Sequence, residues 1–233
     1  MEADLARPTH TPPIINAPPM VAGLAVLLVA AHAVRALAGP DLGMQALMAG
    51  ALQPDRFWAW AGLGAADAVP YGSPFAALVP LVSEALLHDG WAGAILNAAL
   101  VVLAGRPVYR ALYWGKGGAS GQFLVLFIVS VLGGSVAHLV SHYPSGPALM
   151  GASGGVSGLL GALVIREEGR DGRVLSQRFG FLLLVFAAVN VALALAGPAV
   201  LGAEISWQAH IGGFLAGAIA FVLLRPERKS PRF

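Results

Sequence analysis

Apolar residues form six runs along the chain, separated by shorter stretches that hold most of the charged side chains. The runs cover residues 20–34, 88–104, 123–142, 153–165, 179–196 and 207–224. A helix that crosses a bilayer needs about 20 mostly apolar residues, and the fourth run is shorter than this. The pattern predicts an all-α polytopic membrane protein, a bundle of six transmembrane helices whose fourth member is short.

The segment between the first two runs, residues 39–80, is long and mixed in character. Residues 44–52 within it favour a helix, and three aromatic residues follow close to two charged ones, at Asp55, Arg56, Phe57, Trp58 and Trp60. Aromatic side chains beside charged ones are typical of the lipid headgroup region, and an ordinary packed loop is the equal alternative. We expect a long first loop in either case.

The two ends of the chain differ from the apolar runs. Residues 1–19 are rich in proline and predict a disordered tail, and residues 225–233 form a short basic tail. Residues 20–224 then form one membrane-embedded domain. A secretory signal peptide is the alternative for the first run, since Ala36-Leu37-Ala38 resembles a cleavage site. Arg35, directly after the apolar run, and the few basic residues before it favour a retained span.

Composition supports a membrane protein and excludes an ordinary soluble domain. Hydrophobic residues make up 57% of the chain and charged residues 11%, with a mean hydropathy of +0.73. Soluble domains have about 45–50% and about 25%. The net charge of +2 does not indicate nucleic-acid binding, because the charges cluster in short loops. Without cysteine, the chain has no disulfide and no cysteine metal site.

Basic residues predict how the chain crosses the membrane. The loops at 143–150 and 197–206 contain no lysine or arginine, and the segment 39–80 contains only Arg56. Lysine and arginine are enriched in cytoplasmic loops, so both termini are expected in the cytoplasm and the first loop outside. Short loops, no recognised targeting sequence and an alanine-rich composition favour a bacterial inner membrane. The basic residues fall in three places: Arg106, Arg110 and Lys116; Arg166, Arg170, Arg173 and Arg178; and Arg225, Arg228, Lys229 and Arg232.

The fourth run begins with a polar, glycine-rich stretch, residues 151–158, in which Ser153 is suited to start a helix. A helix over residues 153–165 spans about 20 Å of a hydrocarbon layer about 30 Å thick. Its start therefore lies about 10 Å below the outer surface. At that depth, unpaired backbone N–H groups are tolerated only where protein or a water-filled cavity satisfies them. A hydroxyl, helix-terminal N–H groups and water are expected to share one pocket.

Two further polar residues lie at nearly the same predicted depth. Asn97 is about 9 Å below Trp91, and His210 is about 5 Å below Trp207, with both tryptophans taken as interfacial. Polar residues inside a bilayer are costly and point to function. Serine needs a base to act as a nucleophile, and neutral histidine can accept its proton. We therefore predict a Ser153–His210 dyad, with Asn97 and helix-terminal N–H groups stabilising an oxyanion.

The surroundings of this predicted dyad contain no suitable carboxylate. Glu204 is the nearest acidic residue in sequence but precedes its span, so packing is expected to orient His210. Small residues that recur every four positions let membrane helices approach closely. They do so on the fourth and sixth runs, at Gly154, Gly158 and Ala162 and at Ala209, Gly213 and Gly217.

Each residue also has a structural interpretation. A lone membrane serine is most often a packing residue, as we expect for Ser157, and a lone asparagine or histidine often only joins helices. The shared depth of Ser153, His210 and Asn97 favours the functional interpretation.

At these residues the sequence resembles the rhomboid family of intramembrane serine proteases. Gly151-Ala152-Ser153-Gly154 is similar to the Gly-x-Ser-Gly nucleophile motif of that family. Ala209-His210-Ile211-Gly212-Gly213 is similar to its Ala-His-x-Gly-Gly motif, and residues 86–91 with Asn97 and residues 105–107 are similar to its second span. The resemblance implies a six-helix bundle that cleaves single-pass transmembrane proteins in lipid without a cofactor or metal. It also implies Ser153 as nucleophile, His210 as base and Asn97 as oxyanion donor.

Three positions depart from the family pattern. Gly93 stands where many members carry a histidine, Ser157 replaces a frequent aromatic residue, and the Trp-Arg pair of the first external loop is absent before Val79-Pro80. A histidine introduced at position 93 is expected not to abolish activity. By analogy with the family, substrate entry involves movement of residues 179–196, whose Asn190 has no evident partner.

Three other functions compete with a serine protease. A catalytically weak or inactive rhomboid-like protein that binds membrane helices would be indicated by loss of Ser153 or His210, and both are present. A transporter or channel should show paired broken helices in two halves, and only one short span is found. The pair His138 and His142 suggests a metalloprotease, but the glutamate of His-Glu-x-x-His is missing.

Overall fold

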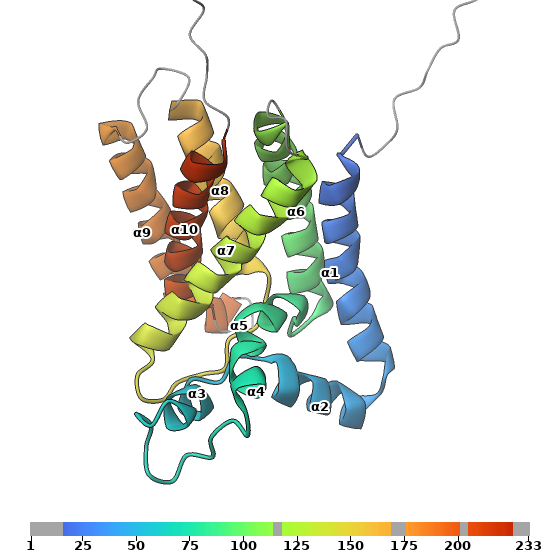
Figure 1. Ribbon diagram of the computed structural model, residues 1–233, viewed down its shortest axis with the longest axis vertical. Helices are drawn as coiled ribbons and strands as arrows, with labels where there is room; N and C mark the ends of the chain where they lie inside the picture. Colours follow the sequence, from blue (N-terminus) through green and yellow to red (C-terminus); the bar gives the residue numbers. More distant parts are fainter. Residues whose placement is uncertain (1–15, 114–117, 169–175, 201–204, 226–233) are drawn as a thin grey trace, which may run out of the picture.

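A computed structural model describes residues 16–113, 118–168, 176–200 and 205–225, which form a helical bundle (Figure 1). Five of the described helices are long and apolar enough to cross a membrane, and α8, with 16 residues, is shorter. This agrees with the predicted all-α bundle and its short fourth member. The six helices of the bundle are α1 (Pro19–Leu37), α6 (Trp91–Leu112), α7 (Ala119–Ser141), α8 (Ser153–Glu168), α9 (Gln177–Val200) and α10 (Trp207–Leu224).

The segment between α1 and α6 folds into short helices at one end of the bundle (Figure 1). The predicted helix over residues 44–52 is displaced, because Gly39, with φ +87°, and Pro40 start α2 earlier. Leu52 lies beyond α2 and pairs with Leu149 in an isolated antiparallel bridge. The short elements are α2 (Pro40–Gly50), α3 (Pro54–Trp60), α4 (Pro74–Leu78), α5 (Pro80–Ser83) and the 3₁₀ helix η1 (Glu84–Leu86).

The aromatic cluster of the first loop was compatible with the lipid headgroup region or with an ordinary packed loop. Trp58 in α3 favours the packed loop at this residue. Its indole Nε1 donates to the Leu139 carbonyl oxygen at 3.1 Å. Its ring meets Tyr143 edge to face, with 5.2 Å between centroids. The first loop is thereby attached to the end of α7.

The main correction to the predicted spans concerns α6, which was expected to end near residue 104. It begins at Trp91 and continues through Pro107 to Leu112. A proline inside a helix destabilises it by about 3 kcal/mol. Val108 and Leu112 beyond the proline are fully buried, and burying each side chain contributes about 1.5–3 kcal/mol. Their packing therefore outweighs the effect of the proline.

Helices α7, α8 and α10 form the centre of the bundle, and glycines set their separation. A Cβ atom added to Gly213 of α10 would lie 2.1 Å from the Gly154 carbonyl oxygen of α8. One added to Gly217 would lie 2.3 Å from the Gly158 carbonyl oxygen. No side chain fits between these backbones, which confirms the close approach predicted from the small-residue spacing.

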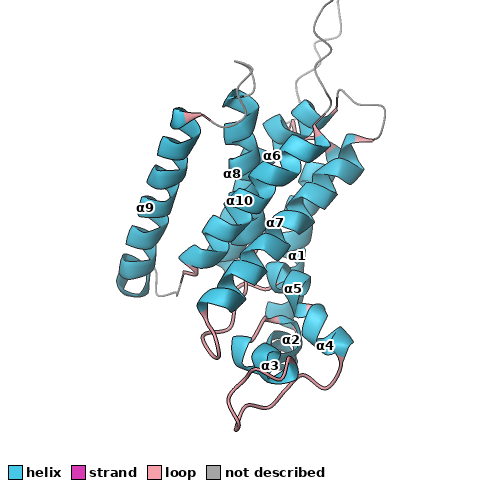
Figure 2. Ribbon diagram, turned by 60° about the vertical axis from the view of Figure 1, so that its left-hand side comes forward, coloured by secondary structure: helices cyan, strands magenta, loops and turns pink. Residues whose placement is uncertain are grey.

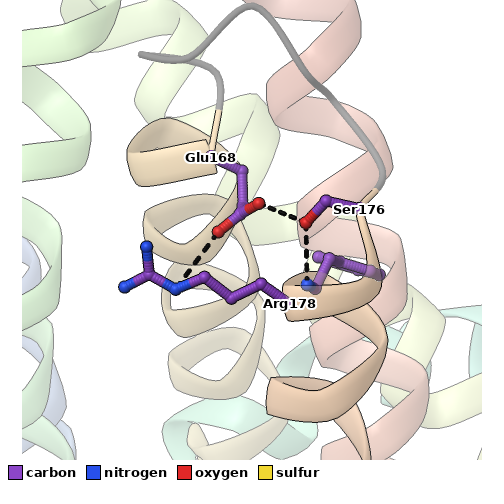
Figure 3. Close-up of polar contacts among 4 residues, drawn as sticks. Glu168, Ser176 and Arg178 are labelled. Carbon is purple, nitrogen blue, oxygen red and sulfur yellow. Dashed lines mark hydrogen bonds and ion pairs between the residues drawn. The ribbon is translucent and has the colours of Figure 1, made fainter.

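Helix α9 lies at the edge of the bundle in both views (Figures 1 and 2), and most of its described side chains are not buried. Its first turn is attached to the last residue of α8 (Figure 3). The Ser176 hydroxyl donates to a Glu168 carboxylate oxygen and accepts from the Phe179 N–H at 3.1 Å. Arg178 Nε lies 3.4 Å from the other Glu168 oxygen. This group, Glu168, Ser176 and Arg178, fixes the start of α9.

Candidate active site

Ser153 is the first residue of α8, as predicted. The turn before it needs glycine at position 151, where φ is +120°. The Ala152 carbonyl accepts the first helical hydrogen bond, from the Val156 N–H at 2.9 Å. The N–H groups of Ser153 and the two following residues therefore have no acceptor within the helix, as at any helix start.

Two residues near the end of the first loop, Glu84 and His88, contact the backbone of this turn. The Gly151 N–H donates to the backbone carbonyl of Glu84 at 2.9 Å. The Ala152 N–H points to Nε2 of His88 at 3.5 Å. The position of the Ser153 turn thus depends on η1 and on the residues that lead into α6.

Burial disfavours the charged form of both residues that support the turn. Burial raises the pKa of Glu84 well above its ordinary value. Burial, together with neighbouring His32, lowers the pKa of His88 to about 4. One carboxyl oxygen of Glu84 and Nδ1 of His88 have no hydrogen-bond partner among the described residues. The side chains of Glu84 and His88 under the Ser153 turn are therefore buried, and the Arg35 guanidinium donates to the His88 carbonyl at 2.6 Å.

His210 lies in the first turn of α10, which Ser206 caps by accepting from the Ala209 N–H at 3.3 Å. His138 of α7 secures this cap. Its Nδ1 lies 2.8 Å from the Ser206 hydroxyl, and its Nε2 lies 2.9 Å from the Pro147 carbonyl oxygen. Because a carbonyl oxygen only accepts, Nε2 of His138 carries the proton that faces Pro147. The start of α10 is thus tied to α7 and to the following loop.

This arrangement bears on the metalloprotease alternative. Both ring nitrogens of His138 are engaged in hydrogen bonds, and Nδ1 of His142 faces the His138 carbonyl at 2.9 Å. Three of the four nitrogens of the pair are therefore already in use inside the protein. The pair serves to hold α7, the loop and α10 together.

The starts of α8 and α10 meet at backbone level, one residue from each predicted catalytic side chain. The Ala209 carbonyl oxygen lies 3.6 Å from the position of a Cβ on Gly154. Ser153 precedes Gly154 and His210 follows Ala209, so the two sit at neighbouring helix ends, each partly exposed. No hydrogen bond joins them within the described part of the chain.

Asn97 lies on the buried face of α6, together with Ala94, Ala98 and Val101. Helix α6 packs against α8. Asn97 makes no hydrogen bond to Ser153 or His210 among the residues described. Gly93, one turn earlier, is exposed, and a Cβ on it would meet only His88 Cδ2, at 3.9 Å.

The contact that the sequence did not predict is between His210 and Asn190 of α9. His210 Nδ1 and Asn190 Oδ1 form a short hydrogen bond. The expectation that packing orients His210 instead of a carboxylate did not include this contact, in which an amide faces the ring. The available signal was that Asn190 is polar within an otherwise apolar run, but a run of residues cannot identify a partner on another helix.

A known family model matches most of the part of the chain that contains these residues. The family model of the Rhomboid domain matches residues 76–227, from α4 to just beyond α10, and includes Asn97, Ser153 and His210. This chain belongs to the rhomboid family. The observed helical bundle agrees with the rhomboid resemblance of its two glycine-rich motifs.

Two rhomboid relatives are similar over parts of the chain. The rhomboid protease GluP of Bacillus subtilis is 30% identical over 145 residues, which are 62% of this chain and 25% of GluP. The rhomboid protease GlpG of Haemophilus influenzae is 28% identical over 138 residues, 59% of this chain and 65% of GlpG. The chain therefore spans less than two thirds of the length of each relative.

Proposed function

We propose that this rhomboid-family chain is an intramembrane serine endopeptidase that cleaves single-pass transmembrane proteins. The observation that carries the proposal is the backbone contact between the first turns of α8 and α10, which bear Ser153 and His210. Both side chains are partly exposed, although most of α8 is buried. A substrate can therefore reach them.

In the proposed reaction Ser153 Oγ attacks the scissile carbonyl carbon while His210 Nε2 takes the hydroxyl proton. The carbonyl oxygen becomes an oxyanion, which the free N–H groups at the start of α8 and the Asn97 amide stabilise. Collapse breaks the C–N bond, and His210 returns its proton to the leaving amine. Water, activated in turn by His210, then hydrolyses the ester on Ser153.

The length of α8 supports chemistry below the membrane surface. Its 16 residues span about 24 Å, less than the approximately 30 Å of hydrocarbon. Ser153 at its start then lies within the depth of the layer, at the partly exposed end of a helix that is otherwise mostly buried in the bundle. The missing Ser153–His210 hydrogen bond is compatible with this proposal, because catalytic hydrogen bonds often tighten only when substrate binds.

The test compares the purified full chain with three variants, in detergent and in liposomes. Each is incubated with reporter proteins that carry one transmembrane segment, and with a fluorophosphonate probe for reactive serine. The wild type is expected to cleave and to be labelled. Ser153→Ala should do neither, and His210→Ala should lose about 10³-fold or more in kcat. Ser157→Ala, a buried serine one turn along the same helix, is the matched control and should remain active.

Two results would contradict the protease. Cleavage by Ser153→Ala at the rate of the wild type would exclude Ser153 as the nucleophile. A wild type that binds the reporters but neither cleaves them nor reacts with the probe would identify a non-catalytic rhomboid protein.

A further inference from the structure

Asn190 is an exception within α9. The helix lies at the edge of the bundle, and its neighbour Val189 is 52% exposed. Asn190, in contrast, is only 5% exposed and faces His210 of α10. A carboxamide inside a membrane helix is unfavourable unless a partner satisfies it. The partner here is the imidazole of the proposed base.

The orientation of the Asn190 amide follows from its second contact. Its Nδ2 donates to the Phe186 carbonyl oxygen at 2.8 Å, one turn earlier in α9. Turning the amide over would place its oxygen against that carbonyl, and two acceptors repel each other. The Asn190 oxygen must therefore be the atom that faces His210.

Aromatic packing holds this turn of α9 in place. The Phe186 ring stacks on Phe214 of α10, with 4.6 Å between centroids and 30° between planes. Phe214 is fully buried and lies one turn beyond His210 in the same helix. The carbonyl that orients Asn190 and the histidine that Asn190 faces thus belong to turns that pack together.

This orientation determines which nitrogen of His210 carries the proton. A carboxamide oxygen can only accept, so the nitrogen that faces it, Nδ1, must be the N–H donor in the neutral ring. Nε2 then holds the free electron pair. We propose that Asn190 is a positioning residue that fixes the tautomer and the ring plane of His210, so that Nε2 is ready to accept the Ser153 proton.

The proposal rests on the proposed proteolytic reaction, and it differs from a purely structural role for Asn190. An asparagine that only joins α9 to α10 would affect stability. A positioning residue affects kcat, because a misplaced base lowers the rate of proton transfer while substrate binding is preserved.

A kinetic experiment separates these roles in the full-length protein. Asn190→Leu keeps the approximate size but removes the acceptor, and we expect kcat to fall by about 10- to 100-fold with KM within about twofold. Asn190→Asp keeps an acceptor oxygen and should restore kcat to within about tenfold of the wild type. Val189→Ala, on the exposed side of α9, is the matched control and should behave as the wild type. Equal kcat for wild type and Asn190→Leu, or equal losses in Asn190→Leu and Asn190→Asp, would overturn the proposal.

A spectroscopic experiment tests the tautomer independently of proteolysis. The chain is labelled with ¹⁵N-histidine in lipid, at a pH well above about 6.5, where histidine is neutral. The spectrum of His210→Gln identifies the His210 signals by difference. The wild type should carry its ring proton on Nδ1, and Asn190→Leu should show a mixture of tautomers. A His210 proton on Nε2 in the wild type would overturn the proposal, even if Ser153→Ala had shown the chain to be a protease.

Discussion

Gly93 leaves space beside the proposed oxyanion site. It is exposed on α6, and a Cβ there would meet His88 Cδ2 at an ordinary contact distance of 3.9 Å. The first side-chain atom of a Gly93→His variant is therefore accommodated, and its imidazole would add an N–H donor one turn before Asn97. We expect its kcat on the single-pass reporter to equal or exceed that of the wild type, because an extra donor stabilises the oxyanion.

Gly93→Ala is the control for the Gly93→His variant, since it changes the helix backbone preference without adding a donor. Complete loss of cleavage by Gly93→His, with Gly93→Ala active, would show that the oxyanion pocket is arranged differently.

His88 makes stability depend on pH. Its pKa is lowered from 6.5 to about 4 in the folded chain, chiefly by burial, so the unfolded chain binds more protons between these values. The contribution of His88 to stability is therefore complete above about pH 6.5 and is lost as the pH falls toward 4. The melting temperature of the purified protein should follow this decrease. His88→Gln should show a smaller decrease, and an identical pH profile for the variant would contradict this role.

Single residues were predictable where the chemistry is local. The start of a helix at Ser153 follows from a polar, glycine-rich entry into an apolar run, and the structure confirms it. The contact between Asn190 and His210 was not predictable, because it depends on how α9 packs against α10. Nor does the sequence show that His88 lies under Ala152, since the two are far apart in the chain.

Among the helices, the contact between α8 and α10 was the most predictable and is also the most sensitive. The repeated small residues predicted it, and the structure leaves 2.1 Å between the Gly154 carbonyl oxygen and a Cβ on Gly213. Gly213→Val must push the two helices apart. We expect a loss of about 3 kcal/mol or more in the free energy of unfolding, measured by denaturation in detergent micelles. Labelling of Ser153 by fluorophosphonate should be lost as well.

The control for the Gly213→Val variant is the same substitution in an open position of a helix. A Cβ on Gly121 of α7 has no neighbour within 4 Å, so Gly121→Val should change stability only slightly. Equal effects of Gly121→Val and Gly213→Val would show that valine acts through helix preference instead of helix contact.

The residues at which helices end were less predictable than the presence of the helices. Arg106 and Pro107 suggested the end of a span, yet α6 continues because Val108 and Leu112 beyond them join the core. Burial against other helices is a property of the folded chain, and local preference cannot anticipate it.

For the whole molecule, basic residues gather where three helices end. Arg110 and Arg166 lie in the last turns of α6 and α8, and Arg225 directly follows α10. These helix ends lie at one end of the bundle, and the short helices of the first loop lie at the other (Figure 1). Since cytoplasmic segments are rich in lysine and arginine, we expect the basic end in the cytoplasm.

The chain contains no cysteine, so single cysteines report this orientation directly. Ala66→Cys, in the exposed segment between α3 and α4, should react with a membrane-impermeant maleimide in intact spheroplasts. Ser230→Cys, in the basic tail, should react only after the membrane is permeabilised. The reverse labelling pattern would place the proposed active site near the cytoplasmic surface.

The attachment of α9 at its first turn has a mechanical consequence. Because Glu168 binds Ser176, α9 can tilt about this first turn. Asn190 lies about 21 Å along the helix from Ser176. A tilt of about 10° that breaks the Phe186–Phe214 stacking would move Asn190 by about 4 Å, which is enough to separate it from the imidazole. The 24 residues of α9 span about 36 Å, and a bilayer thinner than this favours tilting. Acyl-chain length would then tune the proposed proteolysis without any ligand.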